Sequence, residues 1–180
     1  ADAGAQSIAT GYALRDRVSD TENYYLTFSY HRQVTRNLEL ARQTLESWAH
    51  KHPQAFYPHA FLSGFVSPGS GHYTRAVTEG LRALALDPAF AIGYQNVAWA
   101  YLYLNQPNDA DALLAQAQRH GIDISQFSLL RYAIAFLRGD AHAMAREVME
   151  RRSQHAQGWF EHQEALTLAS DCLIAEANRT

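Results

Sequence analysis

The chain has 180 residues, 47% of them hydrophobic and 18% charged, with a formal net charge of -3 at pH 7. This composition supports a sizeable buried core and argues against disorder, nucleic-acid binding and anionic-membrane binding, the last two of which need a basic surface. The single cysteine, Cys172, excludes an internal disulfide framework and a cysteine-based zinc site. No stretch approaches the roughly 18 apolar residues of a membrane span, and no signal peptide pattern is present. The chain begins at Ala1 and is expected to be part of a longer protein, whose compartment and membrane anchoring stay open.

Residues 1–21 are predicted to form an N-terminal helix and a capping segment. The run Ser19-Asp20-Thr21-Glu22 has the Ser-x-x-Glu form of a capping box, in which the two side chains satisfy free backbone N–H groups of a first helical turn. We therefore expect the next helix to begin directly after Ser19.

Four pairs of helices are then predicted from apolar residues at helical spacing and from short turn-rich joints between the pair members. The first members cover 22–33, 57–66, 92–104 and 127–138, and the second members cover 36–53, 71–88, 105–122 and 139–152. No run of strict alternation indicates a strand. The joint at 67–72, with the sequence SPGSGH, is expected to be one residue longer than its counterparts.

The second helices repeat one pattern with a period close to 34 residues. Ala41 aligns with Ala76 at an offset of 35 residues, and Ala76 aligns with Ala110 at an offset of 34. The longer joint at 67–72 is expected to account for the extra residue. Small residues at these places would let helices pack closely at their crossings. Larger residues are expected to fill the space between helix layers: Tyr25, Phe28, Leu62, Tyr94 and Tyr101.

The period, the run LALDP at 84–88 and the order Tyr94, Val97, Ala98 and Tyr101 resemble the tetratricopeptide repeat (TPR). The resemblance covers about 22–152 and implies an all-α fold, a right-handed α-solenoid of antiparallel helix pairs in a TPR-like superhelix. It also implies three repeats, a degenerate fourth and a partial or degenerate fifth, at 22–55, 56–90, 91–124, 125–157 and 158–180. The family pattern is broken at Arg32, Val66 and Ile122.

A narrower resemblance concerns the stretches at 12–32, 37–54 and 135–150. They are similar to the TPR tail of bacterial serine/threonine protein kinases, and to similar tails on some winged-helix transcriptional regulators. The kinase resemblance implies a regulatory or scaffolding region of a larger signalling chain, with the catalytic domain outside this sequence.

No sequence pattern indicates catalysis, a metal ion or a cofactor. Gly69-Ser70-Gly71 lacks the lysine or third glycine of a phosphate-binding loop, and no His-Glu-x-x-His occurs among the nine histidines. The histidines are expected on the surface or between helices. We therefore predict that these residues form a non-catalytic region without metal or cofactor.

By the TPR resemblance, the first helices line a concave groove that binds a protein or peptide partner. The residues assigned to this groove are aromatics and carboxamides, which suit an extended peptide: Asn23, Tyr30, Gln33, Tyr57, Phe61, Gln95, Asn96, Trp99 and Tyr103. The positions at which one TPR subgroup clamps a C-terminal carboxylate hold mainly Leu26, Tyr30, Gln95 and Leu130, without positive charge. Chaperone-type acidic C-termini are therefore not expected as ligands.

Two other readings compete with peptide binding. A self-association or structural module would form a homodimer through the terminal helices, and an incomplete repeat at the C-terminal end favours such contacts. An enzyme with a small-molecule site in the groove is the least favoured reading, since only the density of aromatics and histidines supports it. The sequence does not specify the partner or the oligomeric state.

Overall fold

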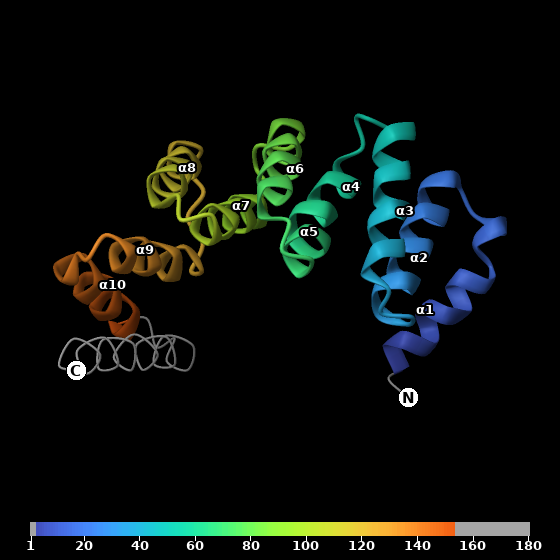
Figure 1. The fold of residues 1–180 in the computed structure, drawn as a ribbon, viewed down its shortest axis with the longest axis horizontal. Helices are drawn as coiled ribbons and strands as arrows, with labels where there is room; N and C mark the ends of the chain where they lie inside the picture. The colour runs from blue at the N-terminus through green and yellow to red at the C-terminus, as the bar shows by residue number, and fades with distance from the viewer. Residues whose placement is uncertain (1–2, 154–180) are drawn as a thin grey trace, which may run out of the picture. The chain divides into compact units, whose positions relative to one another are not determined.

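The computed structural model describes residues 3–153, and all of its regular elements in this range are helices. Clustering of contacts divides the chain into two compact units, Ala1–Asp123 and Ile124–Thr180, which are described separately. The elements, shown in Figure 1, are α1 (Ala3–Ala13), the 3₁₀-helix η1 (Arg15–Arg17), α2 (Asp20–Gln33), α3 (Leu38–Lys51), α4 (Phe56–Phe61), the π-helix η2 (Leu62–Val66), α5 (Ser67–Gly69), α6 (Tyr73–Leu86), α7 (Ala91–Tyr103), α8 (Pro107–Arg119), α9 (Phe127–Leu137) and α10 (Ala141–Ser153).

Helices that follow each other in the first unit pack side by side. The α2 helix packs against α1 and α3, α6 packs against α4, η2 and α7, and α7 packs against α8. The predicted start of α2 is confirmed, because the Ser19 hydroxyl accepts from the backbone N–H of Glu22 at 3.4 Å. The Glu22 carboxylate in turn accepts from the Ser19 N–H at 2.9 Å. This capping box satisfies two N–H groups that the first turn leaves free.

Small residues mark the helix crossings, as predicted. Ala41, Ala76 and Ala110 are completely buried. At Gly80 a Cβ atom would lie 2.2 Å from Val97 Cγ2 and 2.5 Å from Ser63 Oγ. The backbone of α6 thus approaches η2 and α7 more closely than any side chain larger than hydrogen allows.

The expected filling residues are buried with one exception. Phe28, Leu62 and Tyr94 are at most 2% exposed, and Tyr101 is partly buried. The prediction for Tyr25 was wrong, because 49% of this residue is exposed. Its ring lies at the edge of the core, with its centroid 6.0 Å from that of Phe61.

The prediction of a longer joint at 67–72, between the two helices of the second pair, was also wrong. The helix that begins at Phe56 continues through η2 and α5 to Gly69, and the remaining joint, 70–72, is no longer than those at 104–106 and 138–140. The Ser67 N–H donates to the carbonyl of Leu62, five residues back, as in a π-turn. The extra residue in the 35-residue offset is therefore taken up inside a helix.

The second unit is described as far as Ser153. Here α9 packs against α10, with Phe127, Leu130 and Ile134 buried on α9. Arg131 Nε lies 3.3 Å from Glu147 Oε2 across the pair. The predicted fifth repeat at 158–180, Cys172 and the last residues of the predicted fourth repeat lie outside the described residues. The repeat boundaries stay predictions.

Within residues 3–153, no helix is both long and apolar enough to cross a membrane.

Candidate functional site

Three aromatic side chains form a row along the helix that begins at Phe56. The ring centroids of Tyr57 and Phe61 are 5.9 Å apart, and those of Phe61 and Phe65 are 6.0 Å apart. Tyr57 is 57% exposed and Phe65 is 45% exposed. The middle ring stacks at 4.9 Å on buried Phe28 of α2, which ties the row to the core.

The π-helix explains why these three rings remain in line. Tyr57 and Phe61 lie in α4 and are four residues apart. One turn of an α-helix takes about 3.6 residues, so Phe61 lies slightly more than one full turn beyond Tyr57. Phe61 and Phe65 are also four residues apart, but the π-turn between them holds more residues per turn than an α-helix. Phe65 therefore lies slightly less than one full turn beyond Phe61. The two displacements have opposite sense and offset each other.

Helix α2 adds two side chains beside this row. The Tyr25 ring lies 6.0 Å from that of Phe61, and the Arg32 guanidinium lies over the Phe65 ring at 4.1 Å from its centroid. This cation–π contact holds a positive charge at one end of an otherwise apolar row. The groove assignment from sequence included neither Tyr25 nor Arg32 nor Phe65. Tyr25 had been placed in the core, and the face of Phe65 depends on the π-turn.

Helix α7 contacts η2 through Asn96 and carries two further aromatic rings. The Asn96 side chain packs on Gly64 of η2, where a Cβ atom would lie 2.6 Å from Asn96 Nδ2. Trp99 and Tyr103 follow three and seven residues later and therefore share a helix face with Asn96. Their ring centroids are 6.2 Å apart, and Tyr103 also stacks on Tyr73 at 4.7 Å while remaining 61% exposed.

We refer to this set of side chains as the aromatic surface: Tyr25, Arg32, Tyr57, Phe61, Phe65, Trp99 and Tyr103. It includes four of the residues that were assigned to a groove from sequence. Asn96 lies beside it, and neighbouring Gln95 has a buried side-chain oxygen with no hydrogen-bond partner in the described part of the chain.

Two of the other predicted groove residues make contacts within the chain. Asn23 Nδ2 donates to the carbonyl of Arg15 in η1 at 3.1 Å, and the Tyr30 ring stacks on Tyr12 of α1 at a centroid distance of 4.0 Å. The N-terminal segment thus packs on the face of α2 that carries them. Gln33 is exposed at the last residue of α2.

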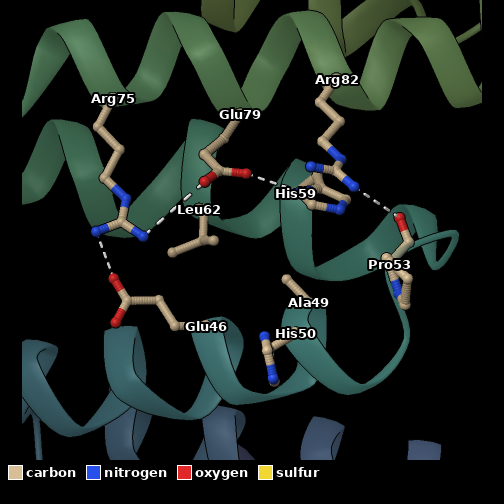
Figure 2. Close-up of a pocket in the computed structure, with 9 residues that line it drawn as sticks. All are labelled: Glu46, Ala49, His50, Pro53, His59, Leu62, Arg75, Glu79 and Arg82. Atoms are coloured by element: carbon tan, nitrogen blue, oxygen red, sulfur yellow. Dashed lines mark hydrogen bonds and ion pairs between the residues drawn. The ribbon is translucent and has the colours of Figure 1, made fainter.

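A pocket of about 290 Å³ lies between α3, α4 and α6, apart from the residues of the aromatic surface. In Figure 2, Arg75, Glu79 and Arg82 project from α6 toward Glu46 and His50 of α3. The complete lining is Glu46, Ala49, His50, Pro53, His59, Leu62, Arg75, Glu79 and Arg82.

Ion pairs between the helices organise this pocket. The side chain of His59 is 3% exposed, and its Nδ1 lies 2.7 Å from Glu79 Oε2. Arg75 is paired with Glu46 and lies 3.9 Å from Glu79, while Arg82 Nη2 donates to the Pro53 carbonyl at 3.2 Å.

Helix α3 extends this network along its own surface. Arg42 pairs with both Glu39 and Glu46, and its hydrogen bond to Glu39 is the main cause that lowers the pKa of this exposed carboxyl to about 2. Glu46 is therefore engaged by two guanidinium groups, those of Arg42 and Arg75.

No group of three histidine, cysteine or acidic side chains that could hold a metal ion occurs among the described residues. Sequence reasoning did not find the pocket, because the pairs that join its helices connect residues 20 or more positions apart. Only helix packing brings His59 to Glu79 and Glu46 to Arg75.

Comparisons with known proteins identify the fold. No family model matches this sequence, and no match was found among curated proteins. A crystal structure of a thermophilic TPR protein from Thermus thermophilus is similar, with a TM-score of 0.64 and 18% sequence identity. The alignment covers 93% of this chain and 90% of that one. The fold class is therefore the predicted one, an all-α TPR-like α-solenoid of helix pairs.

Proposed function

We propose that this chain is a non-catalytic protein-interaction module that binds an extended peptide segment of a partner protein along the aromatic surface. The observation that carries the proposal is the row of rings on α4 and η2, in which Tyr57 and Phe65 are exposed on either side of Phe61, together with the exposed Tyr103 on α7. Exposed aromatic rings at neighbouring positions are a feature of interaction sites rather than of ordinary solvated surface.

The chemistry of the aromatic surface suits a peptide. Tyrosine rings provide large contact areas with few rotatable bonds, and their hydroxyl groups can donate to or accept from a peptide backbone. Tyr25, Tyr57 and Tyr103 are each about half exposed or more, so they are available for contact. Arg32, held over Phe65, supports a preference for a partner segment with a carboxylate or a carbonyl oxygen at that end.

We further propose that the module is the regulatory part of a larger bacterial signalling protein such as a serine/threonine protein kinase. This context rests on the resemblance of residues 12–32, 37–54 and 135–150 to kinase tails. Peptide binding by the aromatic surface does not depend on it.

A peptide-array screen against the purified chain tests the proposal. Two double variants remove different parts of the surface, Tyr57→Ala with Phe65→Ala and Trp99→Ala with Tyr103→Ala. We expect peptides that bind the wild type to lose about tenfold or more in affinity with at least the first variant, the loss typical of removing interface anchors.

The control is Leu40→Ala with Leu81→Ala, which removes two other half-exposed apolar side chains, from α3 and α6. It should bind the same peptides as the wild type. Hits that are indifferent to both aromatic variants contradict the proposal. Absence of hits, together with a wild-type dimer that the aromatic variants convert to monomer, instead assigns the surface to self-association.

A further inference from the structure

One face of α2, formed by Asn23, Leu26 and Tyr30, is covered by α1, the helix that precedes it in the chain. The three residues follow each other at helical spacing and therefore share a side of α2. In Figure 1, α1 lies beside α2 at the N-terminal end of the first unit, and α2 also packs against α3. A segment of the chain itself thus occupies a surface that sequence reasoning assigned in part to ligand binding.

A ring and a glycine of α1 make the closest contacts with this face. The Tyr12 ring stacks on Tyr30 with the ring centroids 4.0 Å apart and an interplanar angle of 6°. A Cβ atom at Gly11 would lie 3.0 Å from Leu26 Cδ2, so the α1 backbone lies directly on this side chain. The pair Gly11-Tyr12 combines a close backbone approach with a large flat contact.

Asn23 receives the chain that follows α1. Its Nδ2 donates to the Arg15 carbonyl in η1 at 3.1 Å, and its Oδ1 accepts from Thr27 Oγ1 at 3.2 Å. The bond from Thr27 orients the carboxamide so that the amide group points at the η1 backbone. Every peptide has backbone carbonyls, so another segment in the same place can accept from Asn23.

Helix α1 is held less firmly than the helices that follow it. Within the described chain, none of its 11 residues is buried, whereas α2 and α3 each contribute buried residues. An isolated helix of this length is marginal in water, so α1 depends on its contacts with α2. Ser7 and Thr10 also bond back to carbonyls four residues earlier, which does not stabilise a helix. Segments with few buried contacts are the first to open locally.

We propose that α1 is a displaceable occupant of this face, and that a partner protein docks an α-helix there in its place. The partner helix carries a small residue directly before an aromatic one, as α1 does. The small residue lets its backbone approach Leu26, and the aromatic ring stacks on Tyr30. None of the three residues of this face belongs to the aromatic surface, so the proposal does not rest on peptide binding there.

The probe is a synthetic peptide of residues 3–17, which contains all the contacts described above. A short tether gives α1 an effective concentration in the millimolar range, so α1 can occupy the face only if the same segment binds from solution at about 1 mM or below. In the wild type the tethered α1 blocks the peptide, because the apparent affinity falls with the fraction of molecules whose face is open.

Tyr12→Ala in the full chain removes the main contact of the tethered helix and leaves the α2 face intact. We expect this variant to bind the peptide about tenfold or more tightly than the wild type does, measured by fluorescence polarisation. Adding Tyr30→Ala should abolish the gain. Equal affinity of the wild type and the Tyr12→Ala chain, or no binding to the latter up to ~1 mM, overturns the proposal.

Tyr73→Ala is the matched control, because it removes a ring from a different stack, that of Tyr73 on Tyr103. It should bind the peptide as weakly as the wild type does, and a gain shared by both variants overturns the proposal. A peptide that carries Tyr12→Ala should not bind, whereas one with Tyr12→Phe should, because stacking needs the ring and not the hydroxyl.

Hydrogen exchange of the wild-type chain provides a second test that does not require the Tyr12→Ala variant to fold. Amides of α1 should exchange faster than those of α2, and an excess of the peptide should accelerate the exchange of α1 further. Amides of α1 that are as protected as those of α2 overturn the proposal. So does a wild-type dimer that Tyr12→Ala converts to monomer, since the occupant would then be α1 of a second copy.

Discussion

Gly80 determines how closely α6 can approach its neighbours. A methyl group there would lie 2.2 Å from Val97 Cγ2, so Gly80→Ala forces η2 or α7 to move. Alanine is favoured over glycine within helices by up to about 1 kcal/mol, but overpacking costs roughly 1–3 kcal/mol. We predict that Gly80→Ala lowers the free energy of unfolding by ~1–2 kcal/mol, measured by urea denaturation.

Gly69→Ala is the matched control for this prediction. Among the side chains that the structure describes, a Cβ at Gly69 would meet only Leu38 Cδ1 at 3.5 Å, an ordinary van der Waals distance. This substitution should leave stability unchanged or raise it slightly. Equal stability of the Gly80 variant and the wild type would show that the crossing relaxes without cost.

Burial was predicted correctly from sequence at the small residues, because only a small side chain fits at a close helix crossing. Ala41, Ala76 and Ala110 recur at the repeat period, and their burial at helix crossings followed from that recurrence. The burial of Tyr25 was predicted wrongly because an aromatic residue on a helix suits both a core position and an exposed contact site. Its position at the boundary is set by Phe61, which belongs to another helix pair.

The start of α2 depends on the capping box at Ser19. The Ser19 hydroxyl accepts a hydrogen bond from the Glu22 N–H. Without the hydroxyl, this N–H group can donate only to water. We predict that Ser19→Ala costs about 0.5–2 kcal/mol of stability, the usual range for loss of an N-cap side chain. The measurement is again the free energy of unfolding in urea.

Ser7→Ala serves as the comparison for the cap. Ser7 lies within α1 and bonds back to the Ala3 carbonyl, a contact that does not stabilise helices. Its removal should leave stability unchanged or raise it slightly, because alanine is the better helix former. If both serine variants lose stability equally, the effect arises from serine removal in general rather than from the cap.

Element existence was predictable here, but the internal geometry of one helix was not. The sequence predicted a helix at 57–66 and an offset of 35 residues between Ala41 and Ala76. A longer joint and a π-turn each account for the extra residue, and the sequence does not distinguish between them. Ser67-Pro68-Gly69 has the composition of a turn, which favoured the joint. The choice is made by packing of η2 against α6, where Ser63 faces Gly80.

For the molecule as a whole, stability should fall on mild acidification because of His31. Its Nδ1 is buried without a partner among the described residues, and burial lowers the pKa of this histidine. The unfolded chain therefore takes up a proton near pH 6.5 at which the folded chain does not. The stability that this difference provides is complete above that pH and is lost as the pH falls toward the lower folded-state pKa.

Urea denaturation at pH values of about 7.5 and 5.5, on either side of the ordinary histidine pKa, tests this prediction. His31→Gln should show a smaller loss of stability between the two conditions than the wild type, whereas His120→Gln, at an exposed position, should match the wild type. The lowered carboxyl pKa values of Asp20, Glu22 and Glu39 add to acid sensitivity only at lower pH. An identical loss in the His31 variant would refute the assignment.

The π-helix at 62–66 has a further consequence, which concerns how repeat arrays diversify. The π-turn places the side chains that follow it at a different angle around the helix axis from that of a regular α-turn, while the joint at 70–72 is as long as those at 104–106 and 138–140. A single inserted codon can thus present a different set of side chains on a ligand-facing helix and leave the neighbouring repeats in place. Insertions of this kind give evolution and protein engineering a means of altering specificity that is separate from both point substitution and loop exchange.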